Sequence, residues 1–201
     1  PMKVAEYERM YAAEARQWWY AGMRAIGFGL LDTVPPASPR ARFLDAGCGT
    51  GLNLEHLARR GRAVGIDLSE EAVALCRRRG VSVVRGSVLD LPFRAASLEG
   101  VVSFDVLYHA WVTDDRSAVR DVARVLRPGG LFLVRVPALR LLWGAHDEAV
   151  LSRHRYHRPE LRDLLEGAGL EVLRLSYCNT FLFPLLLVRR TLDRLLGRHG
   201  S

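Results

Sequence analysis

The stretch Phe43-Leu44-Asp45-Ala46-Gly47-Cys48-Gly49-Thr50-Gly51 decides the fold of this chain. Apolar residues lead into an acidic residue and then into alternating glycines, which predicts a strand, a tight turn and the start of a helix. Because glycine allows positive φ and close approach to the backbone, this turn is a candidate binding loop. Asp67, at the end of the next apolar run, is a candidate partner for the same ligand.

The two acidic residues indicate which ligand the loop would bind. A dinucleotide loop places a pyrophosphate at the helix N-terminus, and Asp45 would repel that phosphate. S-adenosylmethionine (SAM) has no phosphate, but it carries an ammonium, a sulfonium and a ribose. Asp45 suits the cationic end, and Asp67 is placed to accept hydrogen bonds from both ribose hydroxyls. The residues therefore favour SAM.

The segments around this loop alternate between strand and helix patterns. Such alternation predicts an α/β fold, a Rossmann-like doubly wound and mostly parallel sheet with helices on both faces. Ligands of such sheets bind at the carboxyl ends of the strands. The expected strands are 42–46, 62–66, 81–85, 100–105, 131–136 and 170–177, and the expected helices are 51–60, 69–79, 116–126 and 159–167.

Four segments in this order resemble the motifs of class I SAM-dependent methyltransferases of the small-molecule type. They are the glycine loop with Asp67, Val83 to Phe93, Val101 to His109, and Val125 to Leu131. The resemblance implies that Asp45 acts on the methionine ammonium, Asp67 on the ribose and Leu68 on the adenine. The implied cofactor-binding residues are Asp45, Gly47, Cys48, Gly49, Asn53, Asp67, Leu68, Ser87, Val88, Leu89 and Phe104.

Two details of this set are specific to the chain. Family members often carry an acidic residue at the position of Ser87, so Ser87 and the Val88 backbone would serve there more weakly. Phe104 would contribute its backbone carbonyl near the methionine. We expect Cys48 to pack against its neighbours rather than to act as a nucleophile.

The candidate catalytic residues are Tyr108, His109 and His146. Tyr108 and His109 follow the fourth strand, where family members often contact the acceptor. Because an unperturbed histidine titrates near neutrality, His109 is a candidate general base, with a packed histidine as the alternative.

Residues 137–157 form an expected insertion on the ligand side, with His146-Asp147-Glu148 followed by His154, Tyr156 and His157. Together with Trp18-Trp19, its stretch Trp143-Gly144-x-His146-Asp147 resembles a bacterial methyltransferase subgroup whose acceptors are mostly unassigned. The polar cluster could be a hydrogen-bond network, a site for substrate binding or proton transfer, or a metal site. We assign no metal ligand.

The chain is expected to form a single methyltransferase domain. Its parts are a helical cap (1–34, with helices 3–20 and 21–33), the SAM-binding core (40–136), the insertion (137–157) and a C-terminal helix (181–198). No strand is expected after Tyr177, so either the sheet lacks the family's last antiparallel strand or the natural chain continues past Ser201. The apolar run at 181–188 is too short to span a bilayer. It fits a core or capping helix, an interfacial membrane helix or a wall for an apolar substrate.

The composition limits the kinds of partner that the chain is expected to bind. The net charge is +7, and only Lys3 among the 29 basic residues is not arginine. This reflects either an arginine bias or attraction to an anionic partner. Basic and aromatic residues are not interleaved as in nucleic-acid modules, so we expect a small-molecule acceptor and no nucleic acid. Three scattered cysteines and no evident signal peptide predict a reduced, cytoplasmic setting.

The predicted function is transfer of a methyl group from SAM to oxygen or nitrogen of a small-molecule or lipid- or glycan-linked acceptor, with S-adenosylhomocysteine as product. A non-catalytic SAM-binding or scaffold protein is the alternative. A nicotinamide-dependent oxidoreductase is a remote one, because Gly47-x-Gly49-x-Gly51 lacks the dinucleotide spacing and Asp45 opposes a pyrophosphate.

Overall fold

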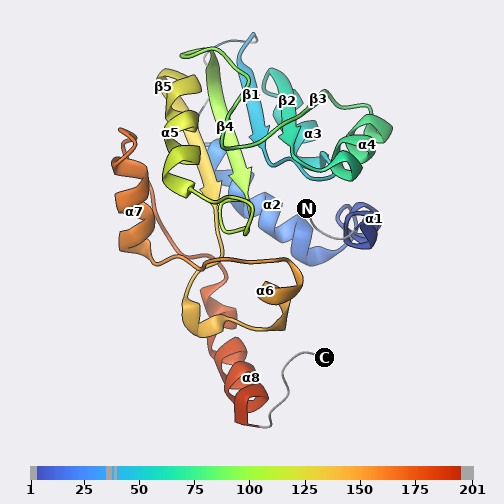
Figure 1. The fold of residues 1–201 in the computed structure, drawn as a ribbon, viewed down its shortest axis with the longest axis vertical. Helices are drawn as coiled ribbons and strands as arrows, with labels where there is room; N and C mark the ends of the chain where they lie inside the picture. The colour runs from blue at the N-terminus through green and yellow to red at the C-terminus, as the bar shows by residue number, and fades with distance from the viewer. Residues whose placement is uncertain (1–3, 35–37, 39, 196–201) are drawn as a thin grey trace.

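A computed structural model describes residues 4–34, 38 and 40–195. Their centre is a five-stranded sheet with the order β3-β2-β1-β4-β5, in which every neighbouring pair is parallel (Figure 1). The strands are β1 (Arg42–Ala46), β2 (Arg62–Asp67), β3 (Val83–Arg85), β4 (Leu98–Phe104) and β5 (Leu126–Arg135). The α/β prediction is confirmed.

Helices cover both faces of this sheet. On one face, Phe28, Leu54 and Leu57 of α2 and α3 pack with Phe43 and Phe104 of the strands. On the other face, buried side chains of α5 and α7 pack on β1 and β4. The helices are α1 (Val4–Ala13), α2 (Trp18–Leu31), α3 (Leu52–Ala58), α4 (Glu70–Arg79), α5 (Asp115–Val125), α6 (Ala145–Ala149), α7 (Arg158–Glu166) and α8 (Phe183–Leu195), with short 3-10 turns η1 (Arg140–Leu142) and η2 (Thr180–Leu182).

The N-terminal segment differs from the expected long helix over 3–20. The chain leaves the helical path between Ala13 and Trp18, and Glu14 lies buried in this break. The Glu14 carboxylate accepts hydrogen bonds from the Thr50 hydroxyl and from Arg79, at 2.6 Å for the Arg79 nitrogen. The break therefore attaches the N-terminal helices to the glycine loop.

The expected strand over 170–177 is wrong. This segment pairs with none of the described strands, although Val172 and Leu175 pack against the core and Leu173 is exposed. The apolar residues of this segment are therefore partly buried by side-chain packing, and its backbone does not join the sheet. Among the described residues, the sheet has no antiparallel strand.

The C-terminal helix α8 projects from the body of the molecule and packs on η1 and η2 (Figure 1). It begins at Phe183, and residues 196–198 of the expected helix lie outside the described part of the chain. None of the described helices combines the length and apolar character that crossing a membrane requires.

Candidate cofactor and acceptor site

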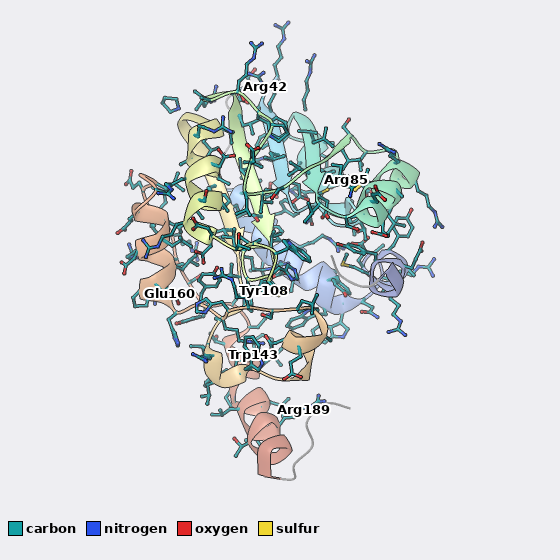
Figure 2. All side chains as sticks on the ribbon, viewed as in Figure 1. Arg42, Arg85, Tyr108, Trp143, Glu160 and Arg189 are labelled. Atoms are coloured by element: carbon teal, nitrogen blue, oxygen red, sulfur yellow. The ribbon has the colours of Figure 1, made fainter. Side chains whose placement is uncertain are left out.

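A cavity of about 1020 Å³ lies at the carboxyl ends of the strands. The loops after β1 to β5 line it, together with α2, the insertion and the start of α8. Tyr108 lies between the sheet and the insertion in Figure 2. This is the edge at which the sequence predicts ligand binding.

The glycine loop forms one wall of the cavity. Gly47 has φ of +84°, and a Cβ added to it would lie 2.3 Å from Val106 Cγ2, so only glycine fits there. The amides of Gly47 and Cys48 both donate to the Ile66 carbonyl, at 2.8 and 3.0 Å. The loop is therefore fixed against β2 with its backbone facing the cavity.

Asp67 lines the cavity at the end of β2. Its Oδ2 accepts from the Gly49 amide at 2.9 Å, and its Oδ1 accepts from the Ser69 amide at 3.0 Å. Burial raises the pKa of this carboxyl, and the amide hydrogen bonds oppose that shift. Asp67 thus joins the glycine loop to the N-terminus of α4, where the Ser69 side chain caps the helix by accepting from the Ala72 amide.

Asp45 lies beneath the glycine loop and does not line the cavity. It is fully buried, and neither carboxylate oxygen has a hydrogen-bond partner among the described residues. Burial raises its pKa to about 7, although Asn53 and Arg135 oppose the shift. A cationic ligand above the loop would favour the ionised form. Its predicted contact with the methionine ammonium stays a prediction.

Asp45→Asn is expected to stabilise the ligand-free protein at high pH. The raised folded pKa means that protonated Asp45 contributes stability at acid pH, and this contribution is lost as the pH rises through about 7. Above that pH the protein buries an unpaired charge, which the amide removes. We expect the melting temperature to rise by about 4 °C or more at pH ~8, with little change at pH ~4. The exposed Asp90→Asn is the control, and an equal shift at both pH values would contradict the assignment.

The remaining predicted cofactor residues divide into two groups. Leu89 does not line the cavity, and its side chain packs against the core. Its amide donates to Ser87 Oγ at 3.1 Å. Cys48 lies 3.7 Å, sulfur to sulfur, from Cys76, and that contact together with burial raises its pKa, as expected for a packed thiol. The cavity is lined by Gly47, Cys48, Gly49, Asn53, Asp67, Leu68, Ser87, Val88 and Phe104.

The acceptor side of the cavity contains a stack of three rings. The His109 imidazole lies between Tyr108 and Trp111, with centroids 4.3 Å from each. Its Nδ1 is 2.9 Å from the Val150 carbonyl, which can only accept, so Nδ1 carries the proton and Nε2 has the lone pair in the neutral form. Burial lowers the pKa of His109, so it is neutral at physiological pH. Burial and Asp105 raise the pKa of Tyr108, which keeps its hydroxyl protonated.

The insertion is held by buried polar contacts. Asp147 accepts from Arg155 at 2.7 and 3.1 Å and from the Gly144 amide at 2.9 Å. The Tyr156 hydroxyl donates to Asp115 at 2.8 Å. These contacts are those of a hydrogen-bond network, and the described residues contain no cluster of three or more potential metal ligands. His146 belongs to α6, but its side chain lies outside the described part of the structure.

Several charged residues that line the cavity were not predicted from the sequence, among them Asp105, Arg135 and Glu14. Asp105 directly follows β4, and Arg135 is the last residue of β5. The two form an ion pair, with Arg135 Nε 3.0 Å from Asp105 Oδ2. Their position at carboxyl ends of strands was a usable signal. Glu14 was hidden because the expected helix runs through it without a break.

Comparisons with known proteins agree with this geometry. Residues 44–134 match a family model described as a methyltransferase domain. The chain is 35% identical over 193 residues to a probable SAM-dependent methyltransferase of Mycobacterium tuberculosis, covering 94% of this chain and 65% of the relative. It is 39% identical over 134 residues to a probable SAM-dependent methyltransferase of Mycolicibacterium smegmatis, covering 64% and 51%. The chain therefore spans between half and two thirds of these relatives.

A solved structure from Thermotoga maritima, titled a SAM-dependent methyltransferase and possible histamine N-methyltransferase, has a TM-score of 0.63 and 26% identity. The match covers 84% of this chain and 78% of the Thermotoga maritima chain. The fold is that of class I methyltransferases. Residues 44–134 are similar to a methyltransferase domain, and these comparisons support SAM as the cofactor.

Proposed function

We propose that this chain transfers a methyl group from SAM to an oxygen or nitrogen atom of a small or lipid-linked acceptor. The observation that carries the proposal is one cavity that joins the glycine loop and Asp67 to the neutral imidazole of His109. Bound SAM would supply an electrophilic methyl group on a sulfonium.

The residues of the chain would act by position and by proton transfer. The glycine loop and Asp67 would orient the cofactor, since holding the nucleophile in line with the methyl carbon supplies much of the rate. His109 Nε2 would accept the proton that the acceptor loses, because Val150 fixes the proton on Nδ1.

The acceptor half of the cavity is largely apolar. Its walls include Val136, Leu139, Leu142, Val150 and Leu161, beside the ring stack. Such walls suit an acceptor with apolar parts. The ion pairs Asp105–Arg135 and Asp147–Arg155 neutralise most of the charge that lines this space.

The test begins with calorimetric titration of the protein with SAM and S-adenosylhomocysteine, with NADH as control. We expect both adenosyl compounds to bind and NADH not to bind. A panel of carboxylic acids, phenols and amines with apolar chains should then yield S-adenosylhomocysteine with at least one member. Failure of SAM to bind would overturn the proposal, and binding without transfer to any acceptor would favour a non-catalytic role.

A further inference from the structure

The outer surface of α8 and its neighbours carries exposed apolar side chains. Phe181, Leu185 and Val188 recur at helical spacing and are 76%, 68% and 58% exposed. Leu141 of η1, on which α8 packs, is 49% exposed. We call these four residues the α8 patch. An amphipathic helix with an uncovered apolar face indicates an interaction surface.

We propose that the α8 patch docks on the surface of an anionic lipid membrane. The sequence of α8 contains three arginines and one aspartate, and Arg140 of η1 is exposed. Figure 2 shows Arg189 on α8, in the part of the molecule farthest from the sheet. Apolar residues with adjacent arginines are the combination that binds anionic membranes at the interface. The net charge of +7 acts in the same direction.

The patch adjoins, along the chain, residues that line the cavity. Leu139, Leu142, Thr180 and Phe183 line the cavity, and they are close sequence neighbours of Leu141, Phe181 and Leu185 in the patch. A docked protein would hold this part of the cavity lining near the lipid. If the proposed function holds, the acceptor is a lipid or a lipid-linked molecule that enters from the membrane.

Charge argues against a second copy of the chain as the occupant. A two-fold interface presents the same surface on both subunits, so Arg140 and Arg189 of one copy would approach those of the other. Like charges at an interface oppose association. An anionic surface removes this conflict.

The proposal is tested by co-sedimentation with vesicles of phosphatidylcholine alone and of equal parts phosphatidylcholine and phosphatidylglycerol. We expect binding about 10-fold or more tighter to the anionic vesicles, and weaker binding at high salt. Leu185→Ser/Val188→Ser should weaken anionic binding by about 10-fold or more, because two apolar side chains no longer enter the interface. Val84→Ser on the distant strand β3 is the control and should not change it.

Three results would overturn docking on membranes. They are no binding to anionic vesicles, undiminished binding of the double variant, or a dimer in sedimentation that the double variant dissociates. Melting curves and SAM titration of each variant report on folding, and Arg140→Glu is a second test if the double variant does not fold. SAM binding without vesicle binding defeats docking alone. Vesicle binding without SAM binding defeats the proposed function alone.

Discussion

Asp67→Ala is expected to weaken SAM binding by about 100-fold or more. The carboxylate is predicted to accept both ribose hydroxyls, and charge-assisted hydrogen bonds of this kind contribute about 1.5–3 kcal/mol each. The variant also removes the acceptor for the Gly49 and Ser69 amides, at 2.9 and 3.0 Å, so the glycine loop loses its connection to α4. Calorimetric titration with SAM measures the effect.

Two variants separate ribose binding from general loss of structure. Asp67→Asn retains the shape and one acceptor oxygen, so it should lose less affinity than the alanine variant. Glu70→Ala removes an exposed acid that pairs with Arg85 outside the cavity, and it should leave affinity unchanged. An affinity for Asp67→Ala within about threefold of the original would show that Asp67 does not hold the ribose.

His109→Gln is expected to lower turnover by about 100-fold or more, within the range of general base catalysis. The amide can still donate to the Val150 carbonyl, but it cannot accept a proton from the acceptor. SAM affinity should stay within about twofold. Turnover is measured as S-adenosylhomocysteine formed with an acceptor from the panel.

The pH profile gives a second readout. Burial lowers the pKa of His109 below 6.5, so turnover should fall only as the pH drops through this lowered value and the imidazole becomes protonated. The remaining turnover of His109→Gln should not show this fall at low pH. His56 lies outside the cavity beside Phe28, so His56→Gln is the matched control. It should keep the original turnover and the original fall in turnover at low pH. A large loss of SAM affinity in His109→Gln would instead place His109 in the cofactor site.

The core of the fold follows from local sequence. The glycine loop, Asp67 and the order of strand and helix patterns are set by backbone conformation and by periods of two and 3.6 residues, which single segments reveal. β1 has the predicted bounds, and Ser69 caps α4. These features place the cavity and most of its predicted lining.

Long-range contacts account for what the sequence did not reveal. The break at Glu14 depends on Thr50 and Arg79, which are distant in sequence. The segment 170–177 has a strand pattern, but no described strand lies beside it to pair. His109 takes its tautomer from the Val150 carbonyl, 41 residues further on. Each depends on a partner that no local pattern specifies.

The unpaired carboxylate of Asp45 has a consequence for the lifetime of the protein in a cell. Without ligand, at pH values above about 7, the protein carries on Asp45 a buried charge that desolvation disfavours. A ligand that binds only the folded form shifts the folding equilibrium by mass action. The empty protein should therefore unfold and be degraded by proteases more often than the occupied one, so its abundance would follow the supply of cofactor.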